Sequence, residues 1–394
     1  MPVELQINTR ESDTGSAIRT VNFFNSVKIN LKYDCVASTF AFDMYFDPNN
    51  KEHAEIVGIS HYHEAILKYV HDNGKKQLLI TGYILSQNLP HSSKPELISI
   101  GGYSKPGLIE DCDIPTSLYP LESNGLTFRQ IVNKVLSPFG GKKGIKFVVR
   151  SDKGYSSTGY KTEEQRVDAK IEKSTAPESK NIKSYLTDLA TQKNLVLSHT
   201  PEGNLLVTTA NTDSKPIFEI DIDSQESIGY VSMNLNFNGQ GMHSHITVIQ
   251  QANDEGGNAA TFTIQNPLVP IVYRTKVVNL TSGNDLTAKE AAINELSKEL
   301  KNVNLVIVMD RATYNNTFVT PNETIVVRNR KVGLYKKTRW FIEAVEFEAD
   351  TDSEKVTITC VLPWTYNYYA LNQNGKRSGP YNIFIDPHKN LPDV

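Results

Sequence analysis

The stretch RWFIEAVEFEA at residues 339–349 and the stretch KVTITCVLPW at residues 355–364 decide the fold of this chain. In the second stretch every other residue from Val356 to Leu362 is apolar, which places these side chains on one face of a strand. A short polar loop, TDSE, joins the two stretches, and the apolar run TIVVRN at 324–329 precedes them. Three such runs in succession predict an antiparallel meander.

Strands are also expected in the first hundred residues. Apolar and polar residues alternate in VKINLKYD at 27–34 and in TFAFDMYF at 39–46, so each stretch predicts a long strand with one buried face. Farther along, the turn signal DNG at 72–74 separates the apolar runs AILKYV and LLITGYI, which predicts a hairpin. A short helix over residues 62–70 is the alternative interpretation of the first run.

The central part of the chain follows a different pattern. Thr127 and Gln130 form a capping-box motif ahead of apolar residues at helical spacing, and Asn181 can cap a second helix. Two apolar runs around the turn PEG at 201–203 predict a hairpin, and the polar residues 150–180 predict an exposed loop. The order helix, strand, helix, hairpin predicts a small α+β domain over residues 114–228.

Strands return in the last third. HITVIQQ and ATFTIQ predict a strand pair, and the capping box of Thr287 and Glu290 begins a helix that leads into the apolar strand LVIVMD. We therefore expect a mainly β protein in which the α+β insert separates a β domain over 1–113 from a second over 229–365. Residues 366–394 contain three prolines and little periodicity, which predicts an extended tail.

Composition excludes several classes of protein. A formal charge of −3 provides no basic field for holding phosphates, which disfavours a dedicated nucleic-acid binder. The first residues lack the pattern of a secretion signal, and no apolar run reaches the length of a membrane span, so we expect synthesis in the cytoplasm and no membrane insertion. The three cysteines lie far apart and indicate neither a zinc cluster nor a disulfide framework.

Histidines supply the best metal candidates. His61, His63 and His71 lie close in sequence, but Leu67 stands where a HExxH zinc motif would have its second histidine. His243 and His245 repeat the spacing of two residues. A third ligand is not apparent beside either group, so we expect neither a metal nor a cofactor.

Catalytic motifs are also lacking. The acids Glu110, Asp111 and Asp113 could suggest a glycosidase pair, but neighbouring acids in one short segment usually form a solvated turn. GGKKG at 140–144 lacks the spacing of a phosphate loop. Ser92 and Ser104 have no nucleophile elbow around them, so we expect that this chain is not an enzyme.

Taken in order, the segments resemble the Mu-type phage baseplate hub proteins, a family that includes the late-control D proteins. The resemblance covers roughly residues 20 to 364 and depends on the order of its parts. Tyr103 departs from the pattern of the family, because many of its members carry a basic residue after the glycine of the segment ISIGGYSKPGLIEDCDI. Four anchors carry it: the strand pair VKINLKYD and TFAFDMYF; LLITGYI with ISIGGYSKPGLIEDCDI; LTFRQIVNKVLSPFG with NIKSYLTDLATQKNLVLSHTPEGNLLVTTA; and NPLVPIVYRTKVV, AKEAAINELSKEL and FVTPNETIVVRNRKVGLYKKTRWFIEAVEFEAD.

The resemblance implies two antiparallel β-barrels of the tail-tube type, separated by the α+β domain. It further implies a homotrimer that joins a six-fold tail tube above to a three-fold spike below, beside other baseplate proteins. DNA would pass through its lumen without specific binding, and the protein would be located in the virion. The alternatives are the hub of a type VI secretion or other contractile injection system and a tail-associated peptidoglycan hydrolase.

The C-terminal segment is the expected partner contact, because aromatic side chains carry much of the binding energy at interfaces. The hub pattern does not extend past Trp364. The candidate contact residues are Trp364, Tyr366, Tyr368, Tyr369, Tyr381 and Phe384.

Overall fold

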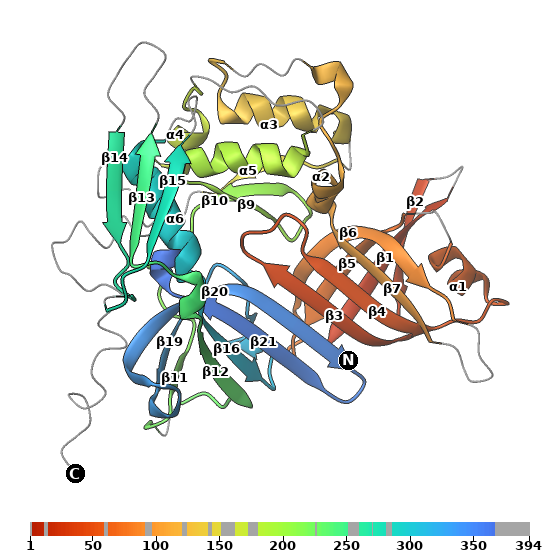
Figure 1. Ribbon diagram of the computed structural model, residues 1–394. Helices are drawn as coiled ribbons and strands as arrows, with labels where there is room; N and C mark the ends of the chain where they lie inside the picture. The colour runs from red at the N-terminus through yellow and green to blue at the C-terminus, as the bar shows by residue number, and fades with distance from the viewer. Residues whose placement is uncertain are drawn as a thin grey trace.

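Two strand-rich regions lie side by side in the computed structural model, with helices α3 and α5 above them (Figure 1). Their strands form one continuous sheet of 13 strands, and three smaller sheets accompany it. The structure describes residues 2–11, 15–58, 62–90, 97–119, 124–140, 144–150, 162–171, 180–224, 227–250, 260–269, 271–280 and 286–366.

The first strand-rich region is antiparallel throughout, with the order β3-β4-β7-β6-β5-β1-β2. The hairpin at residues 64–88 confirms the strand interpretation, and the alternative of a helix over 62–70 is wrong. The strand pair at residues 3–21 and helix α1 were not expected. The elements are β1 (Val3–Glu11), β2 (Gly15–Val21), β3 (Phe24–Lys32), β4 (Thr39–Tyr45), α1 (Lys51–Ile56), β5 (Glu64–Val70), β6 (Lys76–Asn88) and β7 (Leu97–Ser104).

The second strand-rich region contains the expected meander. Its order is β12-β16-β21-β20-β19-β11, in which all pairs are antiparallel except β11 with β19. Val356, Ile358, Cys360 and Leu362 are all fully buried, as their alternation predicts. The elements are β11 (Glu219–Asp221), β12 (Ser232–Phe237), β16 (Val303–Met309), β17 (Thr313–Tyr314), β18 (Thr317–Phe318), β19 (Thr324–Asn329), β20 (Leu334–Asp350) and β21 (Glu354–Val361).

The two regions repeat one topology. Five strands of each are arranged in the same way: the first and second in chain order are neighbours, followed by the fifth, fourth and third. In the first region these strands are β3, β4, β7, β6 and β5, and in the second they are β12, β16, β21, β20 and β19. Both long strands also carry a bulge against the last strand, at Ile84/Ser86 in β6 and at Ile342/Ala344 in β20. The mainly β fold with an α+β insert is thereby confirmed.

Strand β20 joins the two regions. Its first half pairs with β19, and residues 344–350 pair on the same edge with residues 26–32 of β3. The buried side of this joint includes Phe347, whose ring lies 5.4 Å from that of Phe318 and 5.9 Å from that of Tyr69. On the exposed side Lys28 forms ion pairs with Glu346 and Glu348.

The α+β insert has a hydrophobic core of its own. Apart from Val36, the buried residues of this core lie between 109 and 207. The capping box of Thr127 with Gln130 and the Asn181 cap are both present, as the sequence predicts. The insert consists of α2 (Leu108–Asp111), α3 (Phe128–Leu136), α4 (Glu163–Val167), α5 (Ile182–Gln192) and a sheet of β8 (Phe147–Val149), β10 (Leu205–Thr208) and β9 (Val196–His199).

Helix α4 corrects the expectation of an exposed loop over residues 150–180. Thr162 and Gln165 form a third capping box there, and Val167 and Ile171 are buried in the core of the insert. Two apolar side chains are too few to give a recognisable helical periodicity in a polar sequence, although the capping-box motif can be identified from the sequence.

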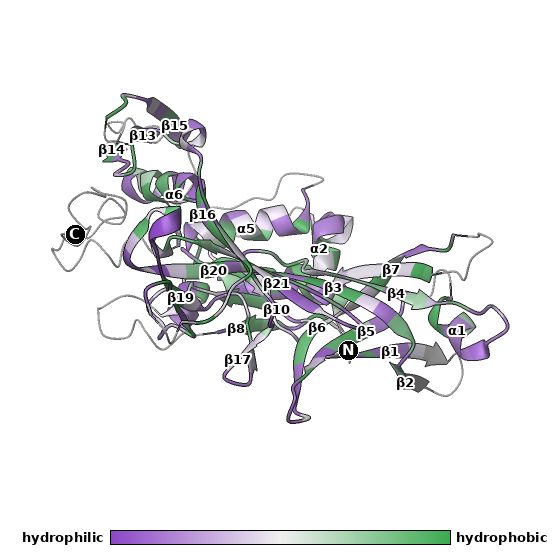
Figure 2. Ribbon diagram, turned by 90° about the horizontal axis from the view of Figure 1, so that it is seen from below, coloured by the Kyte–Doolittle hydropathy of each residue, from purple (hydrophilic) through white to green (hydrophobic). Residues whose placement is uncertain are grey.

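The strands between residues 245 and 280 do not join the large sheet. β13 (His245–Gln250), β14 (Ala260–Gln265) and β15 (Thr275–Leu280) form a separate sheet in the order β14-β13-β15. Helix α6 (Ala288–Leu300) covers one face, where Ile246, Val248 and Ile264 are buried. Figures 1 and 2 show this unit to one side of the large sheet.

A buried polar chain connects the insert to the first region. The Ser38 hydroxyl accepts a hydrogen bond from the backbone N–H of Lys32 and lies 2.5 Å from His199 Nε2. His199 Nδ1 lies 3.2 Å from the carbonyl oxygen of Thr200, which can only accept. The proton of the neutral ring is therefore on Nδ1, and Nε2 accepts from Ser38.

Removing Phe347 should loosen the joint between the regions. Phe347→Ala leaves a cavity among fully buried rings, and we expect a loss of about 3–5 kcal/mol in the free energy of unfolding, measured in urea. Lys28→Gln is the matched control in the same strand pair, because an exposed ion pair contributes only about 0–1 kcal/mol. Equal losses for the two variants would contradict this account of the joint.

Acidification should destabilise the contact at His199. Burial lowers the pKa of His199 below its ordinary value. Below a pH of about 6.5 the imidazole of His199 takes up a proton in the unfolded chain but stays neutral in the folded one. The free energy of unfolding is therefore highest above that pH and decreases as the pH falls. The variant His199→Asn should show a smaller loss of unfolding free energy between pH 7 and pH 5 than the wild type. A loss of the same size in both proteins would refute this role.

Candidate functional site

The two described members of the histidine group, His63 and His71, make separate contacts. His63 Nε2 lies 2.8 Å from the Glu55 carbonyl oxygen, and His71 Nε2 lies 3.2 Å from Gln77 Oε1, at the opposite end of β5. Leu67 is fully buried between them, and His61 lies outside the described residues. Within the described ranges, no three His, Cys, Asp or Glu side chains converge as metal ligands.

The second histidine pair is used in packing. His243 Nδ1 lies 2.8 Å from Glu299 Oε1, and the ring of His245 lies 5.4 Å from that of Tyr273. Lys276 also reaches Glu299, at 3.5 Å. These contacts fix α6 against the small sheet.

The acids at 110–113 each hold a neighbouring element in place. Glu110 forms an ion pair with Lys183 of α5 at 2.5 Å, and Asp111 accepts a hydrogen bond from the Tyr103 hydroxyl. Burial and this carboxylate raise the pKa of Tyr103. Asp113 forms an isolated bridge with Asn181, at the start of α5. The sequence predicts a solvated turn here, whereas the structure places Glu110 and Asp111 in the short helix α2.

Of the two serines considered as nucleophiles, the structure describes Ser104. Ser104 is fully buried and donates a hydrogen bond to the Val36 carbonyl oxygen at 2.6 Å. The three cysteines are free thiols, and burial raises the pKa of each, which lowers the thiolate fraction. Ser92 and residues 141–143 of the glycine-rich stretch lie outside the described residues.

A charged cluster anchors the end of the described chain. Lys301 Nζ lies 2.5 Å from Asp34 Oδ2, 2.9 Å from Glu343 Oε1 and 2.9 Å from the Tyr366 hydroxyl. Burial lowers the pKa of Lys301, but the two carboxylates outweigh it and raise the pKa above its ordinary value. The cluster joins residues from the first region, α6, β20 and the segment after η6 (Pro363–Thr365).

Tyr366 is engaged within the chain. Its ring packs against Tyr33 and Phe341 at 5.1 and 5.2 Å, and burial raises the pKa of its hydroxyl. Trp364 is half-buried and packs on the main core. The other candidate contacts, Tyr368, Tyr369, Tyr381 and Phe384, lie outside the described residues.

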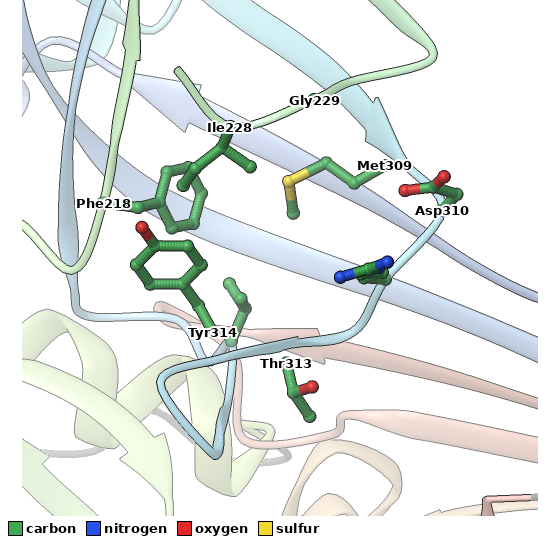
Figure 3. Close-up of a pocket in the computed structure, with 9 residues that line it drawn as sticks. Phe218, Ile228, Gly229, Met309, Asp310, Thr313 and Tyr314 are labelled. Carbon is green, nitrogen blue, oxygen red and sulfur yellow. The ribbon is translucent and has the colours of Figure 1, made fainter. Parts of the chain in front are cut away.

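An apolar pocket with a volume of 410 Å³ lies at the end of β16. Figure 3 shows Phe218, Ile228, Met309 and Tyr314 around its interior, with Asp310 at the edge. Sequence analysis did not find it, because its walls come from segments about 100 residues apart. The lining residues are Phe218, Ile228, Gly229, Met309, Asp310, Arg311, Thr313, Tyr314 and Val319.

Exposed apolar side chains that the sequence did not indicate lie before β15 and at the two ends of β12. Ile271, with 93% of its surface exposed, and Tyr273, with 79%, precede β15. Val231 is 65% exposed and Phe237 53% exposed, one before β12 and the other at its end. Isolated exposed apolar residues are common, but groups of them mark contact surfaces. In the described part of the chain, none of the helices combines the length and apolar character needed to span a membrane.

Comparison of the sequence with protein-family models and with curated proteins finds no match. Comparison of the structure with solved structures does. The 43 kDa tail protein of prophage MuSo2 from Shewanella oneidensis has a TM-score of 0.71 at 18% identity, covering 92% of this chain and 100% of its own. The tail protein from Neisseria meningitidis MC58 has a TM-score of 0.70 at 17% identity, covering 93% and 99%.

A more distant likeness extends to secretion systems. The E. coli c3393 protein, a type VI secretion component described as similar to the T4 tail proteins gp27 and gp5, has a TM-score of 0.51 at 9% identity. It covers 91% of this chain and 76% of its own. The likeness to the Shewanella and Neisseria tail proteins is greater and extends over the insert and both strand-rich regions. This chain therefore has the fold of the Mu-type prophage tail proteins, as the resemblance in its sequence implies.

Proposed function

We propose that this chain is a structural hub of a phage tail baseplate. In this role three copies form a ring that joins a six-fold tail tube to a three-fold central spike and lines part of the channel for genome ejection. The repeated topology of the two strand-rich regions carries the proposal, because three chains then present six equivalent units to the tube.

The fold and the side-chain chemistry support a structural role without enzymatic activity. Among the described residues that could suggest catalysis, His63, His71 and Ser104 contact neighbouring segments at 2.6–3.2 Å. Glu110 and Asp111 also contact neighbouring elements. Two tail proteins, one of them from a prophage, are each matched over 99% or more of their length, which favours a phage tail over a type VI secretion hub.

The partners of this hub would be the tail tube protein, the spike and other baseplate proteins in the virion, after synthesis in the host cytoplasm. DNA would pass through the lumen without specific contacts, since the chain has a net charge of −3. We keep four functional parts: a first β-barrel at 1–113, an α+β domain at 114–228, a second β-barrel at 229–365 and a C-terminal tail at 366–394.

A purified hub should form a ring of three chains. We expect light scattering to give three times the mass of one chain, and electron microscopy to reveal six lobes around a channel. Both techniques are needed, because mass alone does not report the arrangement of the lobes. Particles with two-fold symmetry, or a chain that remains single at every concentration, would count against the hub.

The C-terminal tail should bind a baseplate partner. Deleting residues 367–394 keeps the Tyr366 anchor but removes Tyr368, Tyr369, Tyr381 and Phe384, so the ring should form while infectious particles fall at least about tenfold. The measurement is the titre of a phage that lacks its own copy of the gene and is supplied with the shortened chain. The mass of the ring is the control, and an unchanged titre would remove the tail from the list of contacts.

A further inference from the structure

The two strand-rich regions can be aligned residue by residue from their hydrogen bonds. The backbone N–H of Ile84 in β6 donates to His63, the residue before β5, and that of Ile342 in β20 donates to Glu323, the residue before β19. Both isoleucines precede a bulge of one residue against the last strand. This common point makes Ser86 the counterpart of Ala344, and Asn88 the counterpart of Glu346.

After the bulge, the two long strands β6 and β20 differ in whether a neighbouring strand occupies one of their edges. The edge of β20 after Ile342 is occupied by β3 over residues 344–350. The same edge of β6 after Ile84 has no neighbouring strand among the described residues, although the other edge pairs with β7 as far as Asn88. Ser86 and Asn88 are exposed there, and Leu89 is 39% exposed.

The strand that would complete this edge has a counterpart in β12. The alignment can be carried across neighbouring strands, from β21 to β16 to β12 in the second region and from β7 to β4 to β3 in the first. It makes Asn236 the counterpart of Asn30, and Phe237 the counterpart of Leu31. β3 has strand neighbours on both edges, whereas β12 stands at the end of the described sheet, beside β16 alone. Leu31 is accordingly 5% exposed and Phe237 53%.

We propose that β12 of one copy pairs, antiparallel, with residues 86–89 of β6 in the next copy, and so repeats between chains the joint that β3 and β20 form within one. The register follows from the internal joint, where Glu346 stands opposite Asn30 and Val345 opposite Leu31. Asn88 therefore stands opposite Asn236, and Gln87 opposite Phe237. This interface depends on the proposed ring of three copies and specifies the surfaces that form it.

The side chains at this interface are suited to contact between copies. The internal joint is held on its exposed side by Lys28, Glu346 and Glu348, whose counterparts are Asn234, Asn88 and Pro90. Amide side chains place no like charges across the strands and can donate and accept hydrogen bonds. Pro90 lacks a backbone N–H, so the pairing ends before it.

The contact is head-to-tail, since one copy offers β12 and the other offers β6. Such contacts close into a ring when each step turns by the same fraction of a circle. The joints within and between chains then alternate, and three copies give six similar joints.

Cysteine pairing tests the register. In a background with Cys35→Ser and Cys112→Ser, a mixture of Asn88→Cys and Asn236→Cys should form a disulfide-linked dimer on mild oxidation, and the double variant should form a covalent trimer. Gln87→Cys with Asn236→Cys is the control, because adjacent strand residues face opposite sides of a sheet. Equal cross-linking of the control pair would overturn the register.

Charge pairs test the interface itself. The double variant Asn88→Lys with Asn236→Lys should raise the dissociation constant of the trimer by about tenfold or more, and Asn88→Lys with Asn236→Asp should restore it. Both sites are exposed, so neither change should disturb folding, which circular dichroism would verify. An unaffected trimer in the double lysine variant would overturn this interface and leave the hub standing. A wild-type protein that remains monomeric, together with cysteine variants that form no cross-links, would overturn both the interface and the hub.

Discussion

The antiparallel pairing of β3 with β20 is the constraint on which the rest of the structure depends. It joins residues about 320 positions apart and turns two strand-rich regions into one sheet. β20 can serve both regions because it is 17 residues long, long enough to pair with β19 in its first half and β3 in its second. The bulge at Ile342/Ala344 lies where one neighbour gives way to the other, and bulges bend a strand at such points.

The other units are attached to this sheet by apolar as well as polar contacts. The core of the insert includes Val36 of the first region, and His199 of the insert contacts Ser38. The small sheet and α6 share the main hydrophobic core with the large sheet, and the Lys301 cluster adds charged contacts at the end of α6. The side chains of Lys301 and Asp34 are about one-third exposed, and exposed ion pairs add little stability, so apolar packing carries most of this attachment.

Much of the local structure could be predicted from the sequence, because strand alternation and capping boxes involve residues that are close together in the chain. The meander at 324–361 and the helix caps at Thr127, Asn181 and Thr287 are examples. Pairing across the chain leaves no local pattern, which is why the shared edge of β20 and the separate sheet of 245–280 were not foreseen. The candidate contact at Tyr366 could not be judged either, since the Lys301 cluster that holds it comes from three distant segments.

The two strand-rich regions share a topology but differ in the side chains at their edges. A joint within one chain forms once, so its buried aromatic rings and exposed ion pairs can be permanent. An edge that meets another copy must remain soluble until assembly, and exposed strand edges otherwise favour aggregation. Asn234 and Asn236 contribute polar side chains to the exposed face of β12, and Pro90 limits the length of the edge of β6. Under the proposed pairing between copies, repetition of the backbone with substitution of the side chains lets one topology provide both a fixed joint and a surface for assembly.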